Sequence, residues 1–171
     1  MAERTGLVAV DGNPLTIVGT ALSVGDKAPS FTLAANDLSP VESSAYDGKV
    51  RIIAAVPSLD TDVCDAETRR FNQEAAGLGD DVVILTISMD LPFAQARWCG
   101  AAGVDRVVTL SDYRRGSFGS AYGVFIKENG LLARSVFVVD REGVIRYIQI
   151  VKEITEEPDY GARLKAVNRL V

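Results

Sequence analysis

The sequence contains no histidine, and this absence excludes several kinds of active site. A Ser-His-Asp triad and a Cys-His protease pair both need an imidazole as general base. Zinc sites that use histidine are excluded as well, and two cysteines alone make a poor zinc site. Neither common pattern of glycine-rich phosphate loop occurs. We therefore expect no metal ion and no cofactor.

Long apolar runs and blocks of like charge are also lacking. No segment approaches the roughly 20 apolar residues of a membrane-spanning helix, so we expect no membrane partner. The apolar stretch Leu7–Val10 is too short for the core of a signal peptide. The net charge of −5 is dispersed, which argues against nucleic acid as a partner. We therefore expect a cytoplasmic protein, whose thiols are kept reduced.

Only two cysteines are present, Cys64 and Cys99. In a reducing compartment such residues are inert parts of a core, metal ligands or redox groups. Without an imidazole, activation of a cysteine must come from a helix N-terminus, from an arginine, or from both.

The chain of 171 residues with 47% apolar content is long enough for one domain with a full core, residues 1–171. Two short apolar runs around Asp11–Pro14 predict an N-terminal hairpin. Continuous apolar runs predict buried strands. The further strands that we expect are Phe31–Leu33, Val50–Val56, Val82–Ser88, Val107–Leu110, Arg134–Val139 and Val144–Val151.

Helical spacing of apolar residues begins at Thr61, where Val63 and Phe71 lie on one side and Glu67 and Arg70 on the other. Further helices are expected after Pro92, over Ser117–Tyr122 and over Pro158–Leu170, with one helical turn at Ser43–Tyr46. The order is two strands, then β-α-β-α-β, then β-β-α. This order predicts an α/β thioredoxin-like fold, with a central mixed sheet flanked by helices.

Cys64 falls in the first turn of the helix that Thr61 is expected to cap. Free backbone N–H groups and the helix dipole favour a thiolate there. Pro57 precedes the turn and can shield the sulfur from water, and the Thr61 hydroxyl can bond beside it. The alternative is that each cysteine is a small apolar core residue. That alternative has more weight for Cys99, whose neighbours Trp98 and Ala96 are ordinary core residues.

The segment from Pro57 through Thr61 to Cys64 resembles the active-site signature of the peroxiredoxin family, in particular its thiol peroxidase branch. The resemblance extends over about residues 7 to 165. The segments that carry it are Gly12–Pro14, Gly25–Pro29, Phe31–Leu33, Val56–Cys64, Arg69–Gln73, Asp90–Gly100, Ala121–Val124 and Glu153–Tyr160.

The resemblance implies a peroxidase that reduces hydroperoxides. Cys64 would be the peroxidatic cysteine, which becomes a sulfenic acid, and Cys99 the resolving cysteine, which forms an intrachain disulfide with it. Thr61 and Pro57 would shape the pocket, and Arg134 would favour the thiolate and polarise the peroxide. Thioredoxin would be the electron donor, and the family assembles as homodimers.

Three features depart from the family's usual pattern. Asp62 and Asp65 flank Cys64 where small residues are usual, and their charges would oppose a thiolate unless they point to solvent. The loop Lys127–Gly130 before Arg134 is short. Trp98 stands in place of phenylalanine beside Cys99. Since the cysteines lie on different helices, we also expect local unwinding before they can bond.

Two other functions also depend on a reactive cysteine. A thioredoxin-like disulfide reductase or isomerase needs a second cysteine three residues after the first, and Glu67 occupies that position. A non-enzymatic redox sensor, whose disulfide alters a partner surface, remains open.

Overall fold

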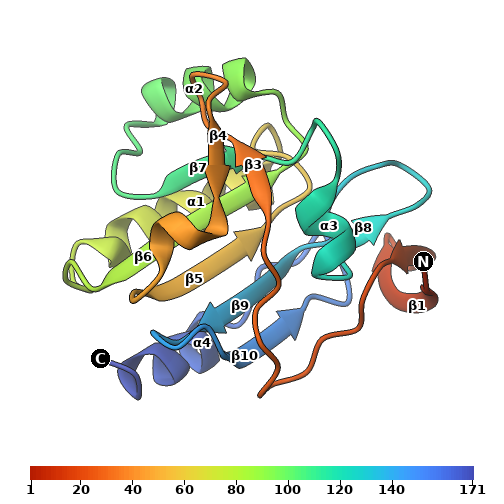
Figure 1. Cartoon of the computed structure of the whole chain (residues 1–171). Coiled ribbons are helices and arrows are strands. Elements are labelled where there is room, and N and C mark those ends of the chain that lie inside the picture. Colours follow the sequence, from red (N-terminus) through yellow and green to blue (C-terminus); the bar gives the residue numbers. More distant parts are fainter.

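The computed structural model describes all residues from 1 to 171 (Figure 1). The strands are β1 (Glu3–Val10), β2 (Asn13–Val18), β3 (Thr32–Ala34), β4 (Pro40–Glu42), β5 (Val50–Ala55), β6 (Val82–Ser88), β7 (Val108–Ser111), β8 (Phe125–Ile126), β9 (Ser135–Val139) and β10 (Ile145–Ile150). The helices are the 3₁₀ turn η1 (Ser43–Tyr46), α1 (Asp62–Ala75), α2 (Pro92–Ala102), α3 (Ser117–Ala121) and α4 (Tyr160–Asn168).

A seven-stranded mixed sheet forms the centre of the molecule, in the order β10-β9-β5-β6-β7-β3-β4. Strands β5, β6 and β7 run parallel, whereas β9 is antiparallel to β5 and β3 is antiparallel to β7. The carboxyl ends of β5 and β6 therefore lie side by side, and the loops that follow them meet at one edge of the sheet.

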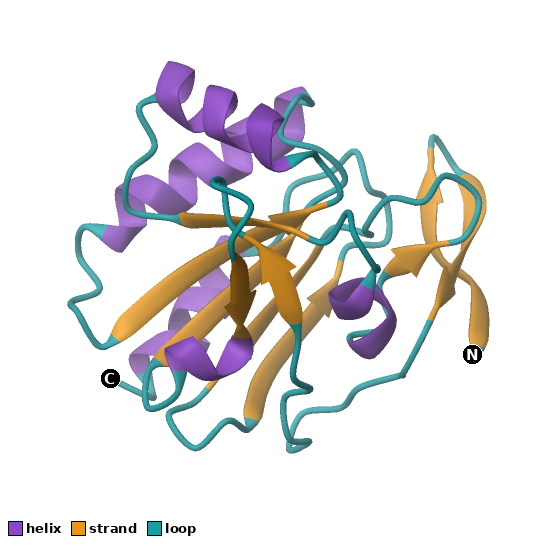
Figure 2. Ribbon diagram, turned by 45° about the horizontal axis from the view of Figure 1, so that its top comes forward, coloured by secondary structure: helices purple, strands orange, loops and turns teal.

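Both faces of the sheet are covered, which explains why every residue of β5 is buried. Ile52 and Ala54 join a cluster with residues of α1 and α4, while Ile53 and Ala55 join a second cluster with residues of α3 and the N-terminal hairpin. Figures 1 and 2 show α3 and the hairpin on one side of the sheet and α1 and α4 on the other. The expected α/β thioredoxin-like fold is confirmed.

The N-terminal hairpin is present, but its limits differ from the prediction. Strand β1 begins at Glu3, and the turn consists of Asp11 and Gly12 alone. Asn13 and Pro14 already pair with Val10 and Ala9 inside the sheet. Pro14 is tolerated there because β8 pairs with β2 only at Ile17 and Val18, so no strand adjoins Pro14 on the side away from β1.

Two strands were not predicted. Strand β4 has no buried residue, and β8 has only two residues, so neither carries an apolar pattern. The predicted helices are confirmed with shorter ends. Helix α4 begins at Tyr160, because the Asp159 carboxylate caps it by accepting from the Ala162 N–H at 2.9 Å. No helix reaches the length and apolar character that crossing a membrane requires.

Candidate active site

Cys64 lies in the first turn of α1, directly after the loop that follows β5. Its side chain is fully buried and packs with Val56 and Leu59. Thr61 occupies the N-cap position, so the expected helix start is confirmed, but its side chain makes no capping hydrogen bond to the helix. The first-turn N–H groups have no partner within the helix, and Cys64 is therefore in the position where a helix favours negative charge.

The loop that leads to Cys64 is held by Asp90, which follows β6. The Asp90 carboxylate accepts from Ser58 Oγ at 2.7 Å and from the Leu59 N–H at 2.8 Å. It also accepts from Ser88 Oγ at 2.7 Å. Sequence reasoning did not identify Asp90 as a site residue. The available signal was its position at the carboxyl end of a strand parallel to β5.

Arg134 lies just before β9 and points into the site. Its Nη2 donates to Cys64 Sγ at 3.2 Å, and its Nε donates to the carbonyl oxygen of Ile154 at 3.0 Å. Burial opposes the charge of this guanidinium, but Glu67 and Cys64 together raise the pKa of Arg134 above its ordinary value. A permanent positive charge therefore contacts the sulfur in a position closed to water.

Glu67 completes the buried group, and here the sequence-based assignment is wrong. The prediction placed Glu67 on the polar side of the helix, but its side chain is fully buried. Its Oε2 lies 2.5 Å from Arg134 Nη1. Burial raises the pKa of Glu67 to about 7, although Arg134 acts to lower it. The missed signal is the spacing of three residues from Cys64, which puts both side chains on one helix face.

Pro57 and Thr61 lie in the loop between β5 and Cys64. Pro57 is buried, and it separates the apolar strand from the turn. The exposed Thr61 hydroxyl donates to the carbonyl oxygen of Ser58 at 2.9 Å, so its donated bond stays within the loop and does not go to the sulfur. Both lone pairs of that hydroxyl oxygen remain available to accept a bond.

The two aspartates that flank Cys64 have different surroundings. Asp62 is exposed in the first turn of α1, where an acidic residue stabilises the helix. Asp65 accepts from Trp98 Nε1 at 2.8 Å and forms an ion pair with Arg69, whose Nε is 2.8 Å from Oδ2. Asp62 is therefore in contact with solvent, and the charge of Asp65 is balanced by the Trp98 and Arg69 donors.

Cys99 lies in the last turn of α2, and the two cysteines are not bonded to each other. The Cys99 sulfur is 3.4 Å from Thr109 Oγ1, and Thr109 in turn donates to Asn36 Oδ1 at 3.2 Å. Cys99 is partly exposed and lines a cavity of about 410 Å³ between α2, β7 and the loop after β3. The resolving candidate is therefore the more accessible of the two thiols.

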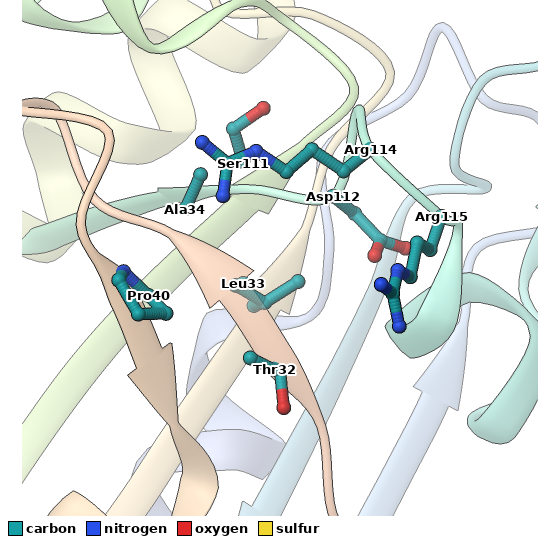
Figure 3. Close-up of a pocket in the computed structure, with 8 residues that line it drawn as sticks. All are labelled: Thr32, Leu33, Ala34, Pro40, Ser111, Asp112, Arg114 and Arg115. Atoms are coloured by element: carbon teal, nitrogen blue, oxygen red, sulfur yellow. The ribbon is translucent and has the colours of Figure 1, made fainter.

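Another cavity, of about 250 Å³, lies away from both cysteines. Figure 3 shows it beside β3, lined also by Pro40, Ser111, Asp112, Arg114 and Arg115. The Asp112 carboxylate already accepts from the N–H groups of Phe118 and Gly119. No three histidine, cysteine, aspartate or glutamate side chains are arranged to hold a metal ion.

A mixed sheet flanked by helices, with a buried cysteine at a helix start in contact with a buried arginine, places the protein in the thioredoxin-like class. Residues 23–164 match the Redoxin family. The chain therefore belongs to that family.

Curated relatives agree with this assignment over nearly the whole chain. The thiol peroxidase of Halalkalibacterium halodurans is 55% identical over 159 residues, which cover 93% of this chain and 95% of that protein. The thiol peroxidase of Bacillus subtilis is 55% identical over 171 residues, which cover 100% of this chain and 99% of that protein.

Solved structures show the same fold. A peroxiredoxin-like protein from Aquifex aeolicus superposes with a TM-score of 0.91 and 43% identity, covering 98% of each chain. The thiol peroxidase from Chromobacterium violaceum has a TM-score of 0.85 and 22% identity, covering 95% of each chain, and supports the fold alone.

Proposed function

We propose that the protein is a thiol-dependent peroxidase that reduces hydrogen peroxide and organic hydroperoxides. The observation that carries this proposal is the 3.2 Å contact between Arg134 Nη2 and Cys64 Sγ at the start of α1. A guanidinium beside the sulfur stabilises the thiolate, which is the nucleophilic form of cysteine. The same cation stabilises the negative charge that develops on the peroxide oxygens during attack.

The first step transfers one oxygen atom. The Cys64 thiolate attacks the nearer peroxide oxygen, the O–O bond breaks, and Cys64 becomes a sulfenic acid. The other oxygen leaves as an alkoxide, or as hydroxide when the substrate is hydrogen peroxide, and takes up from solvent the proton that the thiol released, which gives an alcohol or water. Thr61 accepts a hydrogen bond from the peroxide through its free lone pairs, and Pro57 keeps water from the sulfur.

The second step forms a disulfide. The Cys99 sulfur attacks the sulfur of the Cys64 sulfenic acid, an S–S bond forms, and water leaves. A dithiol protein of the thioredoxin type then reduces the disulfide to two thiols and becomes oxidised itself. Since this cycle consumes reduced thiols, a reducing compartment such as the cytoplasm suits it.

The whole chain, residues 1–171, acts in this proposal as one domain. The N-terminal hairpin supports this, because Val8, Leu15 and Ile17 belong to the same core cluster as the central strands. We further propose a homodimer. Leu91 and Phe93, at the start of α2, are 52% and 65% exposed, and such large apolar side chains are suited to a subunit contact. Phe93→Asp is expected to give monomers by light scattering.

The test uses reduced protein and one equivalent of hydrogen peroxide or cumene hydroperoxide. We expect both thiols of each chain to be lost, far faster than for free cysteine. Cys64→Ser removes the reaction, whereas Cys99→Ser allows one fast oxidation that stops at the sulfenic acid. Reduction of peroxide by Cys64→Ser at the native rate would refute the proposal.

A redox sensor is the alternative function. It predicts one stoichiometric oxidation without turnover when thioredoxin, its reductase and NADPH are supplied. Continuous NADPH oxidation under these conditions distinguishes the peroxidase from the sensor.

A further inference from the structure

The residues next to the two cysteines are hydrogen-bonded to each other. Asp65 follows Cys64 in α1, and Trp98 precedes Cys99 in α2. The Trp98 indole Nε1 donates to Asp65 Oδ1 at 2.8 Å, in a partly buried position. This bond joins the two helices beside the sulfurs that the proposed reaction must bring together.

Arg69 adds a second connection between the same helices. Its Nε donates to Asp65 Oδ2 at 2.8 Å, and its Nη1 donates to the carbonyl oxygen of Ala102, the last residue of α2, at 2.9 Å. The guanidinium carbon also lies 5.8 Å from the centre of the Trp98 ring. Asp65, Arg69 and Trp98 thus tie the start of α1 to the end of α2.

The connection between the two helices determines the directions in which the two cysteine side chains point. Successive residues of an α-helix point about 100° apart around its axis. When Asp65 faces α2, Cys64 must face another direction, and its sulfur contacts Arg134 instead. When Trp98 faces α1, Cys99 is turned away in the same manner, and its sulfur contacts Thr109 on β7.

A disulfide needs the two sulfur atoms at about 2.05 Å from each other. Bringing Cys99 to face α1 requires the last turn of α2 to rotate or unwind, which carries Trp98 away from Asp65. The indole also packs against the cluster of Val56, Leu59 and Cys64, so it occupies space beside the peroxidatic cysteine. Resolution therefore has to break the bond between Asp65 and Trp98.

We propose that Asp65 and Trp98 are positioning residues that hold Cys99 away from Cys64 and thereby slow disulfide formation. The inference rests on the proposed function. While the bond is intact, the Cys64 sulfenic acid persists and can react with a second peroxide molecule. One oxygen of that peroxide adds to the sulfur to give the sulfinic acid, and the other leaves as an alcohol or water. The strength of this bond thus shifts the balance between resolution and overoxidation.

The expected effect follows from the strength of a single hydrogen bond. Because the acceptor is a carboxylate, loss of this bond should speed disulfide formation by about 10- to 100-fold. Trp98→Phe keeps an aromatic ring but has no N–H, and Asp65→Ala removes the acceptor. Asp65→Asn keeps one acceptor oxygen and should have a smaller effect. The double variant should be no faster than the faster single variant, because both changes remove the same bond.

The experiment mixes each reduced variant with one equivalent of hydrogen peroxide, stops the reaction with acid at set times, and measures intact masses after thiol alkylation. The masses distinguish the reduced, sulfenic and disulfide forms. Tyr113→Phe is the matched control, since it removes one aromatic polar group outside this contact. Tyr113→Phe should leave the rates of sulfenic acid formation and of disulfide formation unchanged. All variants should form the sulfenic acid at the native rate.

Two results would overturn the proposal. One is disulfide formation in Trp98→Phe and Asp65→Ala that is no faster than in the native protein. The other needs no variant: Trp98 is the single tryptophan, and its emission should change at the rate of disulfide formation in the native protein. An emission that stays constant contradicts the inference. If instead no sulfenic acid forms in the native protein, the proposed peroxidase function itself fails.

Discussion

Glu67 and Arg134 form a buried ion pair in which Glu67 Oε2 lies 2.5 Å from Arg134 Nη1 and neither side chain reaches solvent. The remaining Nη atom of the same guanidinium contacts the Cys64 sulfur. One guanidinium therefore donates to both the Glu67 carboxylate and the Cys64 sulfur. The ion pair orients the guanidinium so that its other Nη atom contacts the Cys64 sulfur.

Arg134→Lys should slow the reaction of Cys64 with peroxide by about 10- to 100-fold. A lysine keeps the charge but has one ammonium, which cannot contact Cys64, Glu67 and the Ile154 carbonyl oxygen together. The size follows from loss of a hydrogen bond that involves a charged group. Stopped-flow mixing with hydrogen peroxide gives the rate constant. The matched control is Arg146→Lys at a partly exposed ion pair, where the native rate is expected.

Arg134→Met should destabilise the fold by about 3–5 kcal/mol, because it leaves the Glu67 carboxyl buried without its partner. The double variant Arg134→Met/Glu67→Gln should recover a large part of this loss, since the amide carries no charge. Urea unfolding at pH 8 measures both. A double variant no more stable than Arg134→Met would show that the buried charge is not the cause.

Glu67 should make the stability of the native protein depend on pH between about 4.5 and 7. Its pKa is raised from 4.5 to about 7 by burial, so the folded state binds this proton more tightly than the unfolded state. The stability gained from the proton is complete below pH 4.5 and is lost as the pH rises through 7. The Glu67→Gln variant has no titrating carboxyl at this position, so it lacks this contribution to the pH dependence of stability.

The measurement for this prediction is urea unfolding at half-unit steps from pH 4 to pH 8. The difference in unfolding free energy between the native protein and Glu67→Gln should fall across this window. Other carboxyl groups, such as Asp140 and Glu153 with lowered pKa values, are common to both proteins and cancel in the difference. A difference that stays constant with pH would contradict the assignment.

Gly123→Ala should destabilise the fold by about 2–4 kcal/mol. Gly123 has a φ of +64°, and an added Cβ would overlap the Thr20 carbonyl oxygen and the Arg4 guanidinium. The left-handed backbone costs about 1–2 kcal/mol for alanine, and the overlap adds a further cost. Gly12→Ala is the control, because Gly12 has a φ of +76° with no atom nearby. Thermal unfolding should show a clearly smaller loss for Gly12→Ala.

Much of the fold was predictable because its signals are local. The continuous apolar runs of β5 and β6 and the helical spacing after Thr61 gave the correct element types. Strands β4 and β8 were missed, since their pairing depends on neighbours rather than on their own residues. Glu67 was misplaced because a charged residue on a helix is ordinarily solvent-exposed, and its partner Arg134 is 67 residues away.

By itself, the sequence determined that chemistry here depends on cysteine, that Cys64 lies at a helix start, and that no imidazole assists it. These conclusions depend on composition and on neighbouring residues. Tertiary structure decided the rest: it brought Arg134 to a sulfur 70 residues earlier, and it joined Asp65 to Trp98. The physical reason is that hydrogen bonds between distant segments form only when packing of the sheet and helices places donor and acceptor together, and no local pattern encodes that placement.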